Sequence, residues 1–332
     1  MTPLPGDSGP RTASDPRAAA EQVARALVAE LERDRTLDQP AQLRRRVDAA
    51  ERLEAYLPDA SQCVGDATTR ADAALYDREC AIQVRLEAAD AQLFESIRRD
   101  IRQGVGALRL AQWLEPSGHA EAASETARGD AYDYLDVLVA GILQFDSPAE
   151  TVGLAPEMVA YQPTPARHIF DLLRRTNLAA DDVLVDLGSG LGHVPLLAAI
   201  GTSARGVGVE VQPAYVDVAR RSARALGLTR VTFLQQDAQS VDLSAGTVFY
   251  LYTPFTGDIL RCVLDSLRRE ASVRAIRVCT LGPCTEVVGQ EPWLQPDVVL
   301  EADRVVIFSS CDEGVARTRG DSHSSRPEGE RC

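Results

Sequence analysis

Short apolar runs alternate with segments of helical periodicity through the C-terminal half of the chain. Short apolar runs bounded by polar or glycine-rich residues are typical of buried strands, whereas apolar positions three and four apart indicate helices. Strand–helix alternation predicts a parallel sheet covered on both faces. The expected strands are Val183–Leu187, Gly206–Glu210, Val231–Leu234, Thr247–Leu251 and Ala275–Thr280, and the expected helices are Pro165–Arg175, Val194–Ile200, Pro213–Leu226 and Asp258–Arg269.

Two further apolar runs predict that the sheet ends in a hairpin. Val298–Glu301 and Arg304–Phe308 are separated only by Ala302 and Asp303. Such a short connection joins antiparallel strands, so one side of the sheet is expected to be antiparallel. The predicted fold class is therefore α/β, with a doubly wound, mostly parallel, seven-stranded Rossmann-like sheet.

The N-terminal part of the chain has helical patterning without strand-like runs. Val23, Leu27 and Leu31 recur at the spacing of one helix face. Helices are expected around 20–31, over Pro40–Tyr56 and Thr68–Arg102, and over Ala131–Phe145 after a polar linker at 116–129. We predict a disordered leader at 1–15, a helical N-terminal domain at 16–150, a core at 151–311 and a disordered tail at 312–332.

The charge balance bears on the choice of partner. The chain of 332 residues carries a formal net charge of −14, and all its 35 basic residues are arginine. Proteins that bind nucleic acid normally present a basic face that displaces counterions, so nucleic acid is not expected as a partner. The lack of lysine excludes Schiff-base chemistry.

Cysteine, histidine and hydropathy patterns indicate the compartment. The seven cysteines form no Cys-x-x-Cys pair and the four histidines have no metal-ligand spacing, so we expect no metal site. No positively charged apolar signal segment opens the chain, and no apolar run approaches the roughly 18 residues of a membrane span. The expectation is a reduced, soluble, cytoplasmic protein without a membrane segment.

A glycine-rich turn follows the first expected strand. After Asp186, glycine recurs at Gly188, Gly190 and Gly192. A dinucleotide fingerprint is Gly-x-Gly-x-x-Gly, and its third glycine is replaced here by His193. The turn is therefore predicted to hold a nucleoside without a pyrophosphate, which indicates S-adenosylmethionine. The alternative is a tight turn with no ligand.

The next two strand ends add candidate donor-binding residues. Glu210 ends the second strand, where a carboxylate can accept hydrogen bonds from both ribose hydroxyls; the alternative is a solvated carboxylate. Asp237 and Ala238 follow the third strand and are predicted to contact adenine, although Asp237 could instead cap the next segment.

Aromatic and hydroxyl residues mark the end of the fourth strand. Tyr252, Thr253 and Phe255 are the candidate catalytic residues, because this strand end is expected to lie beside the methyl donor. Aromatic faces suit a sulfonium charge; the alternative is an aromatic strand end packed in the core. Upstream, Tyr161 and Thr164 are expected to cover the donor, and Thr164 could also be a helix N-cap.

At these residues the chain resembles the class I S-adenosylmethionine-dependent methyltransferases over about residues 155–310. The run from Asp186 to Gly192, with Glu210 and Tyr161-x-x-Thr164, is most similar to the telomeric-silencing-disruptor histone lysine methyltransferases and their bacterial relatives. The resemblance implies that the glycine turn holds the methionine part of the donor and Glu210 its ribose. It also implies that the Tyr161–Thr164 segment closes over the donor.

The chain departs from that family at two places. The family has glutamate at the position of Pro163 and Asn-Asn-Phe where Tyr252-Thr253-Pro254 stands. The Thr253-Pro254-Phe255 segment partly matches the Asn/Asp-Pro-Pro-Tyr/Phe motif of amino-group methyltransferases, without its leading Asn or Asp. The acceptor is therefore left open.

The expected activity is in-line methyl transfer to an N, O or S nucleophile of a small molecule or a protein. His193 and His168 are weak candidates for a general base. The N-terminal helices are expected to recognise the acceptor or to form a homo-oligomer. The alternatives are a non-catalytic S-adenosylmethionine-binding scaffold or sensor and, less favoured because of His193, an NAD-dependent oxidoreductase.

Overall fold

The computed structural model describes residues 16–56, 70–114, 128–149 and 153–311. The chain divides into two compact units between Glu95 and Ser96. The boundary predicted near residue 150 stays a prediction; in this division the described residues 96–114 and 128–149 belong to the same unit as the sheet. The predicted leader, the tail and nearly all of the predicted linker at 116–129 lie outside the described residues.

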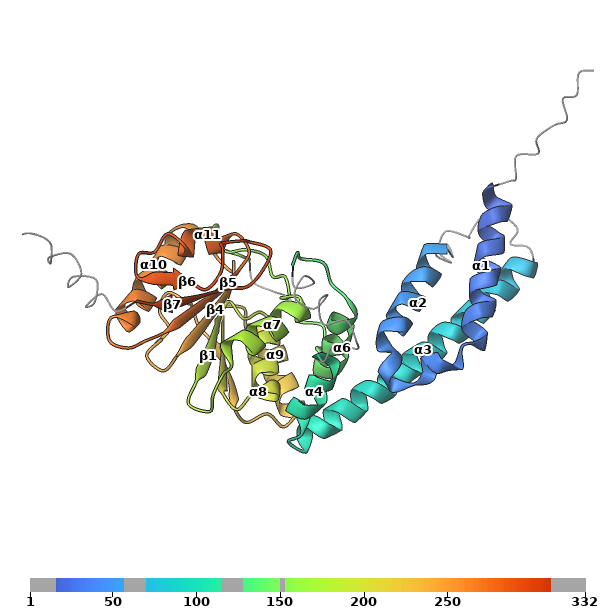
Figure 1. The fold of residues 1–332 in the computed structure, drawn as a ribbon, viewed down its shortest axis with the longest axis horizontal. Helices are drawn as coiled ribbons and strands as arrows, with labels where there is room; N and C mark the ends of the chain where they lie inside the picture. Colours follow the sequence, from blue (N-terminus) through green and yellow to red (C-terminus); the bar gives the residue numbers. More distant parts are fainter. Residues whose placement is uncertain (1–15, 57–69, 115–127, 150–152, 312–332) are drawn as a thin grey trace, which may run out of the picture. The chain divides into compact units, whose positions relative to one another are not determined.

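Helices make up the described part of the first unit, as the periodicity predicts (Figure 1). The elements are α1 (Pro16–Arg33), η1 (Arg35–Asp38), η2 (Pro40–Gln42), α2 (Leu43–Tyr56) and α3 (Arg70–Arg102), which continues into the second unit. Apolar side chains spaced three and four apart form its core, among them Leu27, Val28, Leu53, Ile82 and Leu86. Burial of these faces, rather than helix propensity, stabilises the unit.

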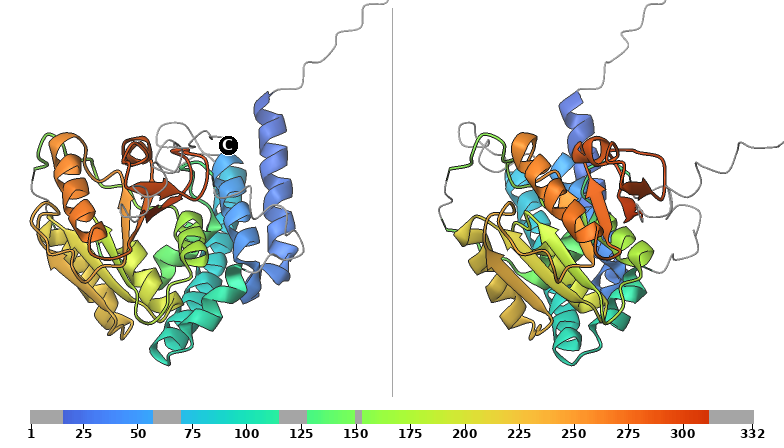
Figure 2. Two further views of the ribbon diagram at one scale, coloured as in Figure 1. Left: turned by 60° about the vertical axis from the view of Figure 1, so that its left-hand side comes forward. Right: turned by 90° about the vertical axis from the view of Figure 1, so that its left-hand side faces the viewer.

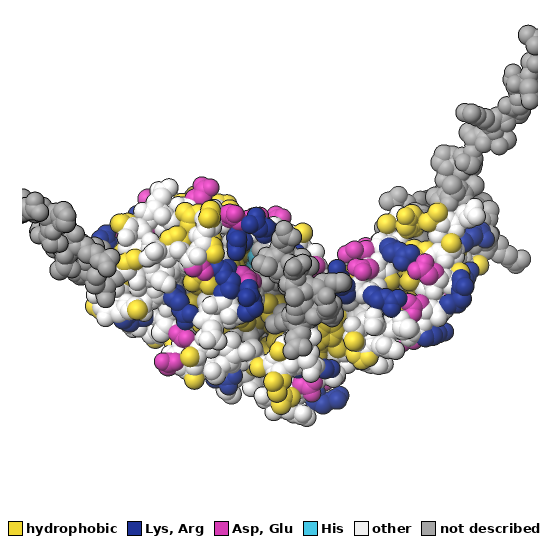
Figure 3. Space-filling view, in the orientation of Figure 1, with side chains coloured by type: hydrophobic (Ala, Val, Ile, Leu, Met, Phe, Trp, Pro, Cys, Tyr) yellow, Lys and Arg dark blue, Asp and Glu magenta, His cyan; other side chains and the backbone are white. Residues whose placement is uncertain are grey.

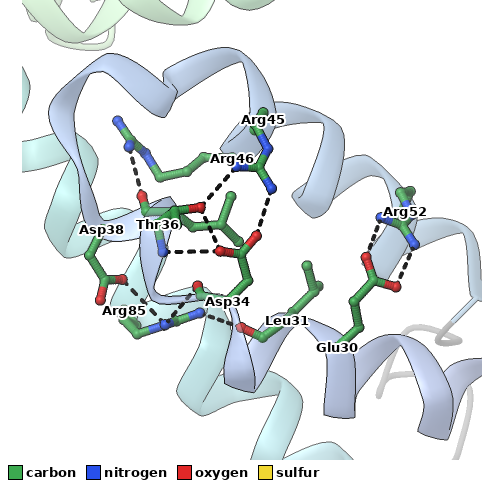
Figure 4. A network of polar contacts seen from close by, with 10 residues as sticks. Glu30, Leu31, Asp34, Thr36, Asp38, Arg45, Arg46, Arg52 and Arg85 are labelled. Atoms are coloured by element: carbon green, nitrogen blue, oxygen red, sulfur yellow. Dashed lines mark hydrogen bonds and ion pairs between the residues drawn. The ribbon is translucent and has the colours of Figure 1, made fainter.

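A buried arginine connects the loops and helices of this unit. Arg46 of α2 is only 1% exposed. Its Nε lies 2.6 Å from Asp90 Oδ1 on α3, and its Nη1 donates to the carbonyls of Leu37 (2.8 Å) and Gln39 (2.7 Å). By contrast, the ion pairs around it are exposed to solvent. Arg52, for example, contacts Glu30 at 3.2 Å, and both side chains are about half exposed (Figure 4).

The second unit contains the predicted sheet with helices on both sides (Figure 1 and Figure 2). The strand order is β3-β2-β1-β4-β5-β7-β6; β7 is antiparallel to β5 and β6 to β7, and the other pairs are parallel. The strands are β1 (Val183–Leu187), β2 (Arg205–Glu210), β3 (Val231–Gln235), β4 (Val248–Tyr252), β5 (Arg277–Leu281), β6 (Leu294–Pro296) and β7 (Val306–Ser310). The predicted fold class is confirmed.

The helices of the second unit are α4 (Gly106–Leu114), α6 (Tyr134–Leu143), α7 (Ala166–Thr176), α8 (His193–Gly201), α9 (Pro213–Ala225), α10 (Gly257–Ala271) and α11 (Cys284–Val288). We did not predict α4 or α11, which are short. No helix among the described residues is long and apolar enough to span a membrane.

The predicted hairpin occurs, but its first strand lies earlier in the chain. β6 is Leu294–Pro296, and the apolar run at 298–301 is not a strand. The side chain of Val299 is 78% exposed, whereas Trp293 is buried and donates its indole N–H to Glu291 at 2.7 Å. The buried Trp293 anchors β6 against β7, and the exposed apolar run forms the connection.

The strand order reverses between β1 and β4, and this reversal positions the site. From β1 the chain crosses to β2 through α8, whereas from β4 it crosses to β5 through α10 in the opposite direction. Right-handed crossovers then place these helices on opposite faces of the sheet. Loops at the carboxyl ends of β1 and β4 diverge, which leaves a crevice where ligands bind in such sheets.

Candidate functional site

A cavity of about 990 Å³ opens at the carboxyl ends of β1, β2 and β4. Its volume is at the upper end of the range for small-molecule sites. Ten of the twelve predicted site residues line it: Tyr161, Thr164, Asp186, Gly188, Glu210, Asp237, Ala238, Tyr252, Thr253 and Phe255. Gly190 and Gly192 are not among the residues that line it, and their contact with a donor stays a prediction.

All three glycines of the turn adopt positive φ: +85° at Gly188, +51° at Gly190 and +86° at Gly192. A Cβ at Gly190 would lie 2.1 Å from the ring of Tyr161, and one at Gly192 would lie 2.5 Å from the ring of Phe233. The glycines therefore permit both the turn and the close approach of two aromatic rings. This is a physical reason for the spacing that does not depend on a ligand.

Glu210 connects the end of β2 to the glycine turn. Its Oε2 accepts from the Gly190 N–H at 2.9 Å, and its Oε1 accepts from the Gln212 N–H at 2.8 Å. Each carboxylate oxygen has two lone pairs, so each can still accept a hydroxyl proton. The carboxylate is thus held in place with acceptor capacity left over, as the predicted ribose contact requires.

Asp186 is a buried carboxylate with no hydrogen bond among the described residues. Its side chain is 4% exposed and lines the cavity. Burial, together with the negative charge of Glu210, raises the pKa of Asp186 well above its usual range. An unpaired buried carboxylate is costly, and a cationic or hydrogen-bond-donating ligand in the cavity would relieve this cost.

We expect Asp186→Asn to stabilise the unliganded protein at neutral pH. The folded pKa lies above the unfolded one, so the native state binds the extra proton, and stability falls as pH rises between the two values. Asparagine does not titrate. The variant's advantage in free energy of unfolding should be near zero at pH 4 and reach the order of 1 kcal/mol by pH 7.

Thermal unfolding of wild type and Asp186→Asn from pH 4 to 7 measures this difference. Asp181→Asn, which changes an exposed carboxylate before β1, is the control and should show no such trend. An Asp186→Asn protein that is less stable than wild type at pH 7 would contradict the assignment of an unpaired carboxylate.

The segment from Tyr161 to Thr164 lines the cavity together with Glu210. The Tyr161 hydroxyl lies 3.2 Å from His193 Nδ1, and its ring packs on Tyr215 with centroids 5.1 Å apart. Thr164 Oγ1 lies 3.2 Å from the Tyr250 hydroxyl. Both side chains are thus held by polar contacts to the floor of the site, which fits the predicted covering role.

The two histidines are poorly suited as general bases. Burial lowers the pKa of His193 to about 4, and its ring packs edge-on to Phe145 at 4.7 Å. His168 lies outside the cavity lining, and its Nε2 is 2.7 Å from the carbonyl of Gly129. Both histidines therefore serve packing and hydrogen bonding in this structure.

The three candidate catalytic residues differ in their surroundings. Thr253 has φ +38°; its Oγ1 donates to the carbonyl of Leu281 at 3.1 Å and accepts from the Cys284 N–H at 3.1 Å. Phe255 is buried in the core of the sheet while bordering the cavity. Tyr252 is half-buried and faces the cavity. Their catalytic roles stay predictions, and Tyr252 is the best placed of the three.

Asp237 makes the contacts of a cap. Its Oδ1 accepts from the Gln239 N–H at 2.8 Å, which closes an Asx turn after β3. The half-buried Ala238 packs against the core of the sheet. The cap alternative is thus realised, and the contact of both residues with adenine stays a prediction.

Three parts of the cavity contain residues that were not singled out as candidate site residues. Tyr250 lies fully buried in β4, and Ser189 of the glycine turn is 6% exposed with its Oγ unpartnered among the described residues. Part of the rim comes from Asp130 and Asp303, on segments joined by a 2.8 Å hydrogen bond from the Gly129 N–H to the Asp303 carbonyl. Of these residues, only Tyr250 could have been found from the sequence, because aromatic residues alternate along β4.

Charge in the cavity has one sign. The residues that line it include five carboxylates and no arginine: Asp130, Asp186, Glu210, Asp237 and Asp303. Elsewhere, acidic and basic side chains are interspersed on the visible face of each unit (Figure 3). No cluster of histidine, cysteine and carboxylate side chains within the described residues could hold a metal ion.

Comparison with solved structures finds methyltransferases that are similar to slightly less than half of the chain. An RNA methyltransferase from Salinibacter ruber, crystallised with S-adenosyl-L-homocysteine, is 28% identical with a TM-score of 0.39 and covers 46% of this chain and 95% of its own. A precorrin-6y C5,15-methyltransferase from Geobacter metallireducens is 17% identical (TM-score 0.36), covering 48% and 94%. The M. jannaschii tRNA m1G37 methyltransferase is 11% identical (TM-score 0.36), covering 47% and 52%.

Sequence comparison finds a match to one family model. No curated protein matches the chain. Residues 178–268, from the approach to β1 into α10, match the family model described as a methyltransferase domain. This match supports the resemblance to class I methyltransferases and the expected cofactor, S-adenosylmethionine; the finer resemblance to the telomeric-silencing-disruptor family stays a prediction. Over residues 178–268 the chain is therefore similar to methyltransferase domains.

Proposed function

We propose that the protein is an S-adenosylmethionine-dependent methyltransferase whose donor binds in the cavity at the carboxyl ends of β1, β2 and β4. The observation that carries the proposal is the unpaired, buried Asp186 in that cavity, beside a glycine turn anchored to Glu210. A donor that bears an ammonium and a sulfonium supplies the positive charge that this carboxylate lacks. The methyltransferase domain match to the same strands and turn supports the choice of donor.

The residues present fit this donor. Glu210 offers acceptor lone pairs for ribose hydroxyls, and Asp186 offers a carboxylate for the ammonium. The aromatic ring of Tyr252 suits a sulfonium. The bound donor would supply an activated methyl group, so the chain's own residues are left to position the acceptor and exclude water.

Calorimetry tests the donor assignment. We expect S-adenosylmethionine and S-adenosylhomocysteine to bind the full chain and NAD not to bind. Glu210→Gln should weaken donor binding about 100-fold. The substitution replaces one carboxylate oxygen, which accepts hydrogen bonds from a backbone N–H and from a ribose hydroxyl, by an amide NH₂ group that can only donate. Glu286→Gln, at an exposed carboxylate of α11, is the matched control. Tight NAD binding without binding of either sulfur compound would overturn the proposal.

A non-catalytic donor-binding scaffold or sensor is the second candidate. The observation that favours it is at the end of β4, where both hydrogen-bonding functions of the Thr253 hydroxyl are engaged and Phe255 belongs to the core. A catalytic protein should transfer a tritiated methyl group from the donor to some component of a cell extract. Donor binding without such labelling would favour the scaffold.

A further inference from the structure

A carboxylate from a distant part of the chain caps the helix that follows β4. Thr256 is the N-cap residue of α10, but its side chain makes no capping hydrogen bond, and its hydroxyl lies 3.5 Å from the carbonyl of Glu157. Glu157 supplies the cap instead: its Oε2 accepts from the Ile259 N–H, the third of the helix, at 2.9 Å. A carboxylate at this place also interacts favourably with the helix dipole. The cap therefore connects two segments that lie 102 positions apart in the sequence.

The first turn of α10 has the space that this side chain needs. Gly257 has a φ of +55°, and a Cβ on it would lie 2.6 Å from Glu157 Cδ. Glycine adopts this conformation without strain and leaves room for the carboxylate. The Thr256 N–H donates to the carbonyl of Glu157 at 2.9 Å, so the turn binds the backbone of this residue as well as its side chain. Glu157 is thus fixed at one position.

Glu157 belongs to a segment that lines the cavity, residues 154–164, which we call the strap. Next to the cap, Met158 forms an antiparallel bridge with Phe255, and the Val159 N–H donates to the carbonyl of Pro254 at 3.1 Å. These partners follow β4, and they line the cavity together with Met158 and the rest of the strap after it. One end of the strap is therefore fastened to the connection between β4 and α10.

The other end of the strap is fixed beside β1. The ring of Tyr161 occupies the space that Gly190 leaves free, and its hydroxyl lies 3.2 Å from His193 Nδ1. Thr164 Oγ1 lies 3.2 Å from the hydroxyl of Tyr250. The strap therefore joins the connection after β4 to the glycine turn after β1. These are the two sides of the crevice in which the donor is proposed to bind.

We propose that Glu157 is a positioning residue that slows release of the donor, because its cap on α10 holds the strap, and with it Tyr161, against the cavity; this inference rests on the proposed function. Glu157 is not among the residues that line the cavity, so it acts through the strap. Without its carboxylate, fewer contacts hold this end of the strap, and Tyr161 leaves the glycine turn more often. The donor then dissociates faster, whereas its rate of association changes little.

The rate of donor release tests the proposal. The full chain is loaded with tritiated S-adenosylmethionine, and the loss of bound label is followed after excess unlabelled donor is added. In Glu157→Ala we expect the dissociation rate constant and the donor Kd to rise about tenfold, with the association rate constant within about threefold of wild type. Glu157→Gln keeps an oxygen that can accept from the Ile259 N–H, so its dissociation rate constant should stay within about threefold of wild type.

Asp258→Ala is the matched control. It removes an exposed carboxylate from the same first turn of α10, and Asp258 does not belong to the strap. Donor release in this variant should be as slow as in wild type. Release as fast as in Glu157→Ala would show that negative charge at the helix end, rather than the contact with the strap, sets the rate, and would overturn the proposal.

Two further variants separate retention of the donor from simple capping of the helix. Gly257→Ala displaces the carboxylate of Glu157 and should release the donor as fast as Glu157→Ala, with no added effect when both changes are combined. Thr256→Asn in the Glu157→Ala background provides a side-chain cap from the residue directly before α10. The melting temperature should then recover towards that of wild type, whereas donor release should stay fast.

The remaining outcomes decide against the proposal in different ways. Wild-type donor release in Glu157→Ala, or release slowed again by Thr256→Asn, would show that Glu157 only caps α10. If Glu157→Ala gives no folded protein, Gly257→Ala decides the same question, because it displaces the carboxylate without removing it. A wild-type chain that binds neither S-adenosylmethionine nor S-adenosylhomocysteine would refute the proposed function itself, so the two failures are distinguishable.

Discussion

Replacing Gly190 with alanine should abolish donor binding while the sheet stays folded. The added Cβ would lie 2.1 Å from Tyr161 Cε2 and 2.4 Å from Cδ2, at a φ of +51° that L-residues adopt at a cost of about 1–2 kcal/mol. Tyr161 cannot turn aside freely, because its hydroxyl contacts His193 and its ring packs on Tyr215. Either the turn shifts and pulls its N–H from Glu210, or Tyr161 leaves the site.

Both responses damage the same binding surface. Overpacking of this kind costs a further 1–3 kcal/mol. We expect the donor Kd to rise at least about 100-fold and the melting temperature to fall by several degrees. Calorimetry and thermal unfolding of the full chain measure these two effects.

Gly201→Ala provides the matched control. Gly201 ends α8, its φ is ordinary, and an added Cβ would meet only Leu173 Cδ1 at 3.8 Å. The same chemical change there should leave donor affinity as in wild type. Wild-type donor affinity in Gly190→Ala would contradict the proposed site. In Gly190→Ala with Tyr161→Ala, recovered stability without recovered binding would locate the clash at the ring.

The strands of the sheet were predictable because local pattern and burial agree for them. Every residue of β1 is buried, which the apolar run Val183–Val185 anticipates for its first three residues. The hairpin was misplaced because the run at 298–301 is as apolar as a strand yet exposed at Val299. What selects β6 is the burial of Trp293 against the sheet, and this contact depends on tertiary structure. An apolar run therefore predicts a strand correctly only where its side chains are also buried in the folded protein.

The candidate site divides in the same way. Asp186 and Glu210 were found because the carboxyl ends of neighbouring parallel strands meet at one edge of a sheet. The engagement of Thr253 was not predictable, because its partners Leu281 and Cys284 come from a segment about thirty residues later. Asp130 directly follows the predicted polar linker at 116–129, and no motif around it marked it as a site residue. The sequence therefore predicts which site residues lie at the strand ends, but it does not predict their hydrogen-bond partners.

The division of the chain at Glu95 could not be read from periodicity. α3 continues as one helix of 33 residues across the division, so the pattern does not change there. Beyond it, α4 contacts α8 and α6 contacts α7, within the sheet unit. Helical periodicity shows which face is buried but not which unit buries it.

Replacing Arg46 with alanine should unfold the first unit locally while donor binding persists. In the variant, Asp90 loses its ion-pair partner, although burial already raises the pKa of this carboxylate. The carbonyls of Leu37 and Gln39 also lose the guanidinium that donates hydrogen bonds to them. Removing one member of a buried ion pair costs about 3–5 kcal/mol. Hydrogen exchange followed by mass spectrometry should show α1 and α2 amides exchanging roughly 10²- to 10³-fold faster, with the β1–β5 amides unchanged.

Arg52→Ala is the control that distinguishes the loss of buried contacts from the loss of a positive charge. Arg52 belongs to the same helix and loses an ion pair with Glu30, but both partners are half exposed, so its removal should cost less than about 1 kcal/mol. Arg46→Met combined with Asp90→Leu should recover much of the protection, because it removes the buried charges together. Equal exchange rates in Arg46→Ala and Arg52→Ala would show that the buried contacts of Arg46 do not stabilise the unit. Loss of donor binding in Arg46→Ala would show that folding of the first unit is coupled to the cavity.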